Sequence, residues 1–183
     1  MLSILILVIL TAINAFFAAS EIAVISLSET KLRKQAEEGD KKAKKLLALM
    51  QAPDNFLSAI QIAITLAGFL NAAFAADSFA GPLVNWLVQD LGVTAIPVGV
   101  LNTLMVILVT IILSYFTLVL GELVPKRIAM KKTEGVARAT VGAVWAVATV
   151  FRPVIWLLSK STNGVLRLLH IISTSAPQQG ASC

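Results

Sequence analysis

The sequence is short of the residues on which many soluble enzymes and secreted proteins depend. Its single cysteine, Cys183, excludes a disulfide within the chain and a metal site made of several cysteines. It has one histidine, His170, and neither a serine–histidine nor a paired-aspartate arrangement that would indicate a hydrolytic enzyme. We therefore expect a protein that is not an enzyme.

Lysine and arginine are missing from the N-terminal segment, since the first of them is Lys31. A secretory signal peptide begins with a positively charged region and has a short apolar core. The N-terminal segment has neither feature. We therefore expect it to be a retained membrane-spanning helix that starts on the outer side.

Charged residues are also scarce, at 14% of the chain, whereas hydrophobic residues reach 57%. Soluble domains average about 45–50% apolar and about 25% charged residues. The composition therefore predicts an all-α membrane protein whose main partner is the lipid bilayer. The formal net charge of +5 is expected to mark the cytoplasmic side of the membrane, and we expect no nucleic-acid partner.

Three apolar segments, at about 2–27, 56–80 and 96–120, reach the roughly 20 residues that a helix needs to cross a bilayer. The segment between the first two, about 29–52, interleaves apolar residues with seven lysines and arginines. This pattern predicts one or two amphipathic helices at the membrane surface, with a turn at Gly39–Asp40.

The basic residues also predict the orientation. Seven follow the first apolar segment, none follow the second and four follow the third. Because lysine and arginine collect on the cytoplasmic side, we expect an outside N-terminus and a chain that crosses the membrane several times.

The last apolar stretch, 136–172, carries Arg138 near its start and Arg152–Pro153 in its middle. A charged side chain near the bilayer centre costs about 2.5–3.5 kcal/mol on insertion scales. We therefore predict helices at the cytoplasmic interface rather than a fourth span. Residues 1–172 then form one membrane domain, and 173–183 are expected to be a linker or a truncated tail.

The third apolar segment ends in an unusual way, with Gly121, Glu122, Pro125 and Lys126 close together. Pro125 has no N–H for the Gly121 carbonyl, which lies four residues earlier. A freed carbonyl beside a carboxylate, at the negative end of a helix dipole, attracts a hard cation such as Mg²⁺ or Ca²⁺. The alternative is that Glu122 pairs with Lys126, four residues on, and the motif only ends the span.

Polar residues in the other two segments could complete such a site. The first segment contains Ser20, Glu21 and Ser26, and the second contains Asn71. Each also has a structural interpretation: Glu21 can reach the interface, the serines can bond to their own helix, and Asn71 can join two helices.

The helical phase of the first segment leaves two interpretations open. Ser20 and Ser26 are six residues apart, so on a regular helix they point about 120° apart. Asn14, Glu21 and Ser28 repeat every seven residues and share one face. The sequence does not decide which of these two sets faces a site.

Three stretches, in this order, carry a resemblance to a known family: "NAFFAASEIAVISLSETKL", "QIAITLAGFLNAAFAADSF" and "GELVPKRIA". They resemble the transmembrane domain of the CorC/CNNM (cyclin M) family, in its bacterial, hemolysin-like form, over about 1–170. The resemblance implies three spanning helices with juxtamembrane helices, a homodimer and cytoplasmic CBS domains. It also implies Mg²⁺ export coupled to Na⁺ and a location in a bacterial inner (cell) membrane.

The resemblance implies an ion site as well. Its ligands would be Ser20, Ser26, Asn71, the carbonyl of Gly121 and Glu122, with Glu21, Pro125 and Lys126 in support. Mg²⁺ prefers six oxygens, so this set lacks one ligand. The alternative function is a dimeric membrane anchor that transports nothing and presents the CBS region, which is not within this sequence.

Overall fold

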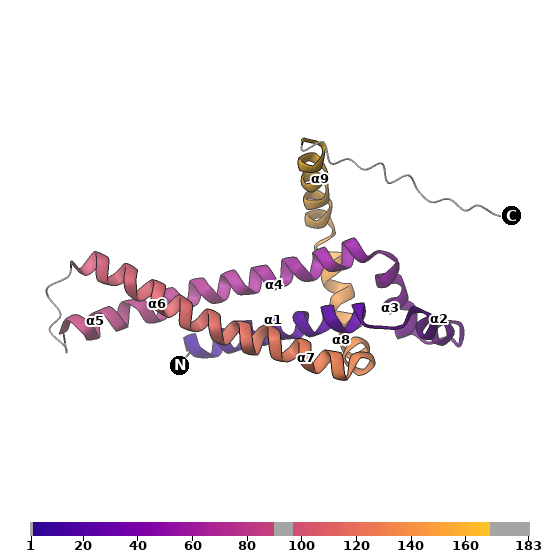
Figure 1. Ribbon diagram of the computed structural model, residues 1–183, viewed down its shortest axis with the longest axis horizontal. Helices are drawn as coiled ribbons and strands as arrows, with labels where there is room; N and C mark the ends of the chain where they lie inside the picture. Colours follow the sequence, from indigo (N-terminus) through magenta and orange to yellow (C-terminus); the bar gives the residue numbers. More distant parts are fainter. Residues whose placement is uncertain (1, 90–96, 169–183) are drawn as a thin grey trace.

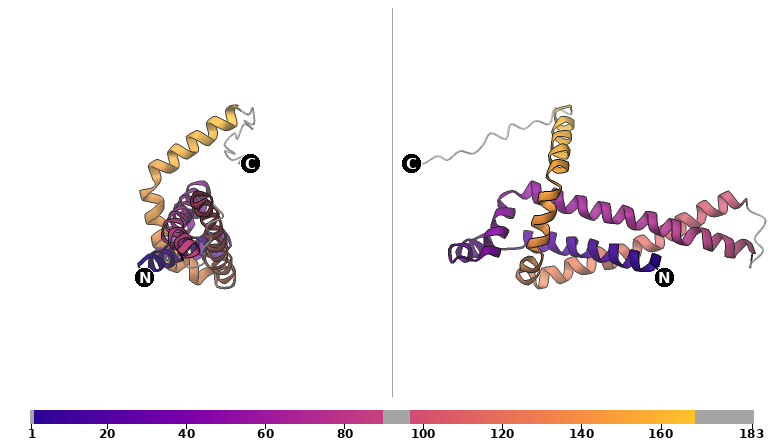
Figure 2. Two further views of the ribbon diagram at one scale, coloured as in Figure 1. Left: turned by 90° about the vertical axis from the view of Figure 1, so that its left-hand side faces the viewer. Right: turned by 180° about the vertical axis from the view of Figure 1, so that it is seen from behind.

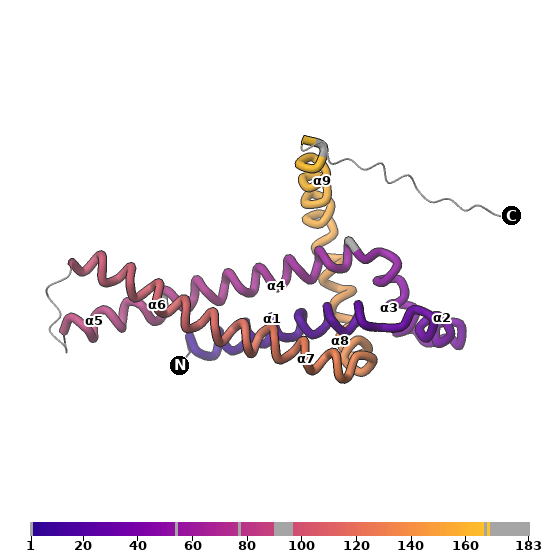
Figure 3. The backbone as a smooth tube through the Cα atoms, in the orientation of Figure 1, coloured from indigo at the N-terminus to yellow at the C-terminus, as the bar shows by residue number. Residues whose placement is uncertain are grey.

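The computed structural model describes residues 2–89 and 97–168, and every regular element in these two ranges is a helix (Figure 1). Three long helices, Leu2–Ile25, Asn55–Gln89 and Val98–Lys131, are long and apolar enough to cross a membrane. They run along the long axis of the molecule, as the tube in Figure 3 also shows. The predicted all-α class with three spanning helices and amphipathic surface helices is therefore confirmed.

The first spanning helix is α1 (Leu2–Ile25), which contains no glycine and no proline. Its 24 residues rise about 1.5 Å each, enough for a hydrocarbon core of about 30 Å. It packs against α4, α7 and α8. Its position between the other long helices makes α1 the central wall of the membrane domain.

The second spanning helix consists of α4 (Pro53–Ala75), a π-helical turn η1 (Ala76–Ala80) and α5 (Gly81–Gln89). The sequence predicted that this span ends at about residue 80, just before the Gly81–Pro82 pair. The chain instead stays helical as far as Gln89. Proline is tolerated in the first turn of a helix, where its missing N–H is not needed, and the widened turn before it accommodates the ring.

The third spanning helix has the same construction. It consists of α6 (Val98–Leu118), a second π-helical turn η2 (Val119–Leu123) and α7 (Val124–Lys131). Pro125 lies in the first turn of α7, so the chain stays helical well beyond the predicted end at residue 120. Each π turn thus precedes a proline and lets the helix continue.

A helical hairpin, α2 (Glu29–Glu37) and α3 (Lys41–Gln51), caps one end of the long helices. Its turn requires Gly39, whose φ of +97° is strained for residues with a side chain. Asp40 then begins α3 by accepting hydrogen bonds from the N–H groups of Lys42 and Ala43, at 2.8 and 3.2 Å. The helix pair and the turn match the sequence prediction for this segment.

The C-terminal part of the described chain forms α8 (Thr133–Val150) and α9 (Arg152–Leu168), which meet at a bend of 67°. Helix α8 crosses the bundle near the hairpin end, and α9 points away from it (Figure 2). Together the pair is apolar enough to be one broken span, so its predicted interfacial position stays a prediction. The predicted tail, 173–183, lies outside the described residues.

The tightly packed core lies at the hairpin end, where α1, α3, α4 and α8 meet. Its fully buried members include Val24, Leu46, Ile60 and Val144. Large apolar side chains elsewhere on the long helices are exposed, as on a surface that faces lipid.

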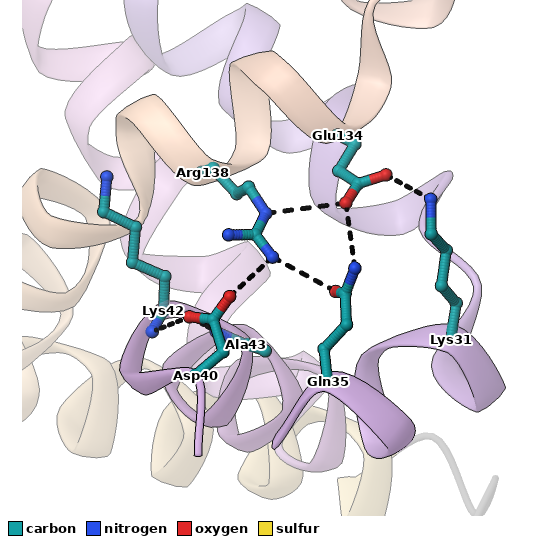
Figure 4. Close-up of polar contacts among 7 residues, drawn as sticks. All are labelled: Lys31, Gln35, Asp40, Lys42, Ala43, Glu134 and Arg138. Carbon is teal, nitrogen blue, oxygen red and sulfur yellow. Dashed lines mark hydrogen bonds and ion pairs between the residues drawn. The ribbon is translucent and has the colours of Figure 1, made fainter. Parts of the chain in front are cut away.

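A polar cluster joins the hairpin to α8 (Figure 4). Arg138 of α8 pairs with Asp40 at 2.6 Å, bonds the amide oxygen of Gln35 at 3.2 Å and contacts Glu134 at 3.5 Å. Glu134 in turn accepts hydrogen bonds from Lys31 and Gln35. Because these contacts connect segments about 100 residues apart, they orient the hairpin relative to the bundle.

We expect acid to weaken this connection. The Ala43 N–H and then Arg138 hold the pKa of Asp40 below its ordinary 3.8, and Lys31 and then Gln35 hold the pKa of Glu134 below 4.5. Stabilisation from a lowered pKa is complete above the ordinary value and is lost as the pH falls through the lowered one. The melting temperature should therefore fall between pH 5 and pH 2, in a range near and below these ordinary values.

Thermal unfolding of the wild type and of Arg138→Gln over this pH range tests the expectation. The variant should have a lower melting temperature at pH 7 and a smaller fall on acidification. Arg33→Gln is the matched control, because among the described residues the ion pair of Arg33 is with Glu29 of its own helix. An unchanged acid response in Arg138→Gln would show that the cluster contributes nothing.

Candidate cation site

A pocket of about 230 Å³ lies where the three spanning helices meet, with walls from α1, α4, α6 and η2. Small and apolar residues, including Gly68 and Ala72 of α4, form part of its wall. The polar side chains that line it all carry oxygen: Asn14, Asn71, Thr110, Ser114, Thr117 and Glu122.

Asn14 of α1 forms one side of the pocket and is only 5% exposed. Its amide nitrogen donates to the Gly121 carbonyl at 3.2 Å. A carbonyl can only accept, so the nitrogen must face Gly121 and the amide oxygen must face elsewhere. That buried oxygen has no hydrogen-bond donor among the described residues.

Asn71 of α4 repeats this arrangement. Its amide nitrogen donates to the hydroxyls of Thr117 at 2.8 Å and Thr11 at 3.3 Å, so it joins all three spanning helices. Its buried amide oxygen also lacks a donor within the described part of the chain. A buried polar atom without a partner costs about 1–3 kcal/mol, so two such oxygens on residues that line one pocket call for an explanation.

The π turn η2 explains how Glu122 reaches the pocket and how Gly121 contacts Asn14, although Gly121 itself is not among the lining residues. Pro125 supplies no N–H to Gly121, and the turn widens so that the Val124 N–H bonds to the Val119 carbonyl, five residues earlier. A Cβ on Gly121 would lie 3.2 Å from the Asn14 amide nitrogen, so glycine permits the close approach to α1. The expected helix end at Pro125 is thus a bulge that places Glu122 in the pocket wall.

Lys126 forms the ion pair that the sequence suggested as an alternative. Its ammonium lies 2.8 Å from one carboxylate oxygen of Glu122 and 3.3 Å from the carboxylate of Glu21 on α1. Glu122 therefore both pairs with Lys126 and lines the pocket. The ion pair and the pocket share one carboxylate and do not exclude each other.

The two predicted serine ligands lie apart from the pocket lining. The hydroxyl of Ser20 is fully buried and donates to the Phe16 carbonyl at 2.6 Å, as a serine bonded to its own helix does. Ser26 follows the end of α1 and is exposed. On α1, Asn14 and Glu21 instead face the third spanning helix, and Asn14 lines the pocket.

Sequence reasoning overlooked the hydroxyls of α6. Thr110, Ser114 and Thr117 follow one another at spacings of four and three, which places them on one helix face. This signal was present in the sequence, and so was Asn14, which was noted only as part of a seven-residue repeat. Both sets become informative only when the pocket brings them together.

The residues that line the pocket carry one carboxylate, two unpartnered amide oxygens and three hydroxyls. Among the residues that the structure describes, no group of three or more histidines, cysteines or acids could hold a metal. An all-oxygen set with little charge suits a hard cation such as Mg²⁺, Ca²⁺ or Na⁺. The Gly121 carbonyl can add to the set, because it has a second lone pair beside the one that Asn14 occupies.

Comparisons with known proteins show the family to which the chain is similar. The family model described as cyclin M transmembrane N-terminal domain matches residues 5–181. A UPF0053 protein of Synechocystis is 40% identical over 92% of this chain and 37% of its own length. The UPF0053 inner membrane protein YfjD of Escherichia coli is 30% identical over 87% of this chain and 33% of its own.

A further relative has a name that states a cargo. The polyamine export protein of Salmonella typhimurium is 28% identical over 92% of this chain and 37% of its own length. The chain thus spans little more than a third of the length of the relatives that it matches.

Proposed function

Because the chain belongs to the cyclin M transmembrane-domain family, we propose that it moves Mg²⁺ across the membrane through the pocket between its three spanning helices. The observation that carries the proposal is that Glu122 and two asparagines with unpartnered amide oxygens, Asn14 and Asn71, line one pocket. A cation would satisfy both buried oxygens, and Glu122 would offset part of the cost of removing its water.

The size and chemistry of the pocket support Mg²⁺. This ion gives up its water reluctantly and usually keeps several molecules. A volume of about 230 Å³ leaves room for a partly hydrated ion, since one water takes about 30 Å³. Water or the α6 hydroxyls would then supply the ligand that the sequence-based set lacked. Ser20 and Ser26 would join only after Ser20 gives up its Phe16 bond or the end of α1 turns inward.

The remaining expectations become parts of the same proposal. We propose export from the cytoplasm with Na⁺ as the coupling ion, a homodimer, and CBS domains on the cytoplasmic side of the full-length protein. Family membership supports the homodimer and the CBS domains. An all-oxygen pocket that Na⁺ could also occupy supports Na⁺ as the coupling ion.

The proposed orientation puts the N-terminus outside a bacterial inner membrane, where the relative YfjD is described as residing. The basic hairpin α2–α3 and the uncharged helix α5 lie at opposite ends of the long helices (Figure 1). Single cysteines at Lys42 and Asn85, in a chain with Cys183→Ser, should therefore react with an impermeant thiol reagent from opposite sides. Labelling of both from one side would reject this orientation.

A flux assay tests transport itself. Proteoliposomes loaded with Mg²⁺ should release it when a Na⁺ gradient is imposed, and Glu122→Gln should reduce the release to the rate of protein-free vesicles. The membrane-anchor alternative predicts that wild type, variant and empty vesicles leak equally. Equal leakage would leave the anchor as the better interpretation.

Polyamines are the second candidate cargo, because two relatives carry the name polyamine export protein. Carbonyl and carboxylate oxygens also accept hydrogen bonds from ammonium groups. The described pocket lining has one carboxylate, Glu122, whereas a chain of several ammonium groups needs several. We therefore expect spermidine to leave the vesicles more slowly than Mg²⁺; faster spermidine release would reverse the assignment.

A further inference from the structure

We propose that the ammonium group of Lys126 competes with the transported ion for the carboxylate of Glu122. When the ion binds, the ammonium moves to the carboxylate of Glu21. This inference rests on the proposed function and adds a residue that sets both affinity and the choice of ion. The juxtaposition that carries it is one ammonium between two carboxylates, one of which lines the cation pocket.

The three groups come from two helices. Glu122 and Lys126 face each other across one turn of the third spanning helix, whereas Glu21 reaches them from α1. Their side chains keep only 22–36% of their exposure, so water screens them weakly. A partly buried charge needs a partner, and each of these has one as long as the ammonium lies between the two acids.

The pairing limits what Glu122 can do for an incoming ion. While the ammonium is 2.8 Å from Glu122, the one carboxylate among the described lining residues is already paired with a positive charge. An entering cation meets its full attraction only when Lys126 moves away. A long, flexible lysine stem permits this movement without a change of backbone.

Glu21 makes the withdrawal possible. It already contacts Lys126 at 3.3 Å, so an ammonium that leaves Glu122 keeps a counter-charge. Glu21 also lines a second cavity, of about 730 Å³, where Ser58, Gln61 and Thr65 of α4 offer further polar atoms. The Lys126 ammonium therefore has two possible positions, beside Glu122 or beside Glu21, and only the first blocks the pocket carboxylate.

This competition also selects by charge. A monovalent ion carries the same charge as the ammonium that it must displace, so it gains little by replacing it. A divalent ion is attracted to Glu122 about twice as strongly at equal distance. Lys126 therefore favours a divalent cargo over Na⁺ at this pocket.

Four variants test the proposal by isothermal titration of MgCl₂ into the purified full chain. Lys126→Gln removes the competitor and should tighten Mg²⁺ binding about tenfold, which corresponds to roughly 1.4 kcal/mol. Lys126→Arg keeps a charge and should stay near wild type. Glu21→Gln removes the alternative carboxylate, so the ammonium stays beside Glu122. Mg²⁺ binding should then weaken about tenfold, although Glu21 does not line the pocket.

The double variant Glu21→Gln/Lys126→Gln separates this account from simple electrostatics. Without the lysine there is no ammonium for Glu21 to hold, so the double variant should bind Mg²⁺ as tightly as Lys126→Gln alone. A direct attraction of Mg²⁺ by Glu21 would instead weaken binding in both backgrounds. Added NaCl should compete with Mg²⁺ more strongly in Lys126→Gln than in the wild type at matched ionic strength.

The outcomes distinguish this inference from the proposed function. If the wild type binds Mg²⁺ but Lys126→Gln binds equally or more weakly, the lysine positions Glu122 and the competition account is wrong. If neither protein binds Mg²⁺, the proposed function falls and the inference falls with it. Thermal unfolding of each variant shows whether a lost signal reflects an unfolded protein.

Discussion

Replacing Glu122 with glutamine is expected to abolish Mg²⁺ binding while the helices remain assembled. Glutamine has nearly the same shape but no charge, and neutral oxygens alone do not compensate for removing water from a divalent ion. We expect the affinity to fall at least about a hundredfold, or roughly 2.7 kcal/mol. The fold should persist because Lys126 keeps its contact with Glu21.

Isothermal titration and thermal unfolding of the same sample measure both parts of this expectation. Glu29→Gln is the matched control, since Glu29 is an exposed acid of α2 that pairs with Arg33 away from the pocket. Its Mg²⁺ affinity should equal that of the wild type. Wild-type affinity in Glu122→Gln would mean that the motif serves only as an ion pair at the end of a span.

Replacing Asn71 with leucine is expected to separate binding from stability. Leucine has a similar volume but supplies no ligand, so Mg²⁺ affinity should fall at least about tenfold, or roughly 1.4 kcal/mol. The change loses two hydrogen bonds to Thr11 and Thr117, which are worth about 0.6 kcal/mol each between membrane helices. It also removes a buried oxygen that costs about 1–3 kcal/mol without a partner, so the stability of the ion-free protein should change little.

Melting temperatures measured with and without Mg²⁺ test both expectations, the lower affinity and the unchanged stability. Mg²⁺ should raise the melting temperature of the wild type, because it binds the folded state, and should leave that of Asn71→Leu almost unchanged. Asn102→Leu is the control, since Asn102 is an exposed asparagine of α6 outside the pocket lining. A large destabilisation of ion-free Asn71→Leu would show that Asn71 holds the helices together and would weaken its assignment as a ligand.

The spanning helices could be predicted because their signal is local. Run length and the absence of charge identify each span, and Gly39 and Asp40 mark the turn and the start of a helix. The continuation of the helices through Gly81–Pro82 and Val124–Pro125 was harder to predict. Proline usually ends a helix, and a π turn that keeps the chain helical depends on the packing of neighbouring helices, which the sequence does not state.

The residues of the pocket could be anticipated in part for a similar reason. Glu122 and Asn71, which line it, were singled out because a carboxylate and an amide are conspicuous in an apolar span. Ser20 and Asn14 differ only in the direction in which α1 turns them, and that rotation is decided by contacts such as Asn14 with Gly121. No property of α1 alone determines it.

The central claim is that one cation is held between Glu122, Asn14 and Asn71. Anomalous scattering from crystals grown with Mn²⁺ in place of Mg²⁺ tests it most directly, because Mn²⁺ takes the same oxygen ligands and its position can be located. We predict one peak in the pocket, within ligand distance of the Glu122 carboxylate and the amide oxygens of Asn14 and Asn71, and no such peak in Glu122→Gln. A Mn²⁺ peak elsewhere in the chain, with this pocket empty, would contradict the account.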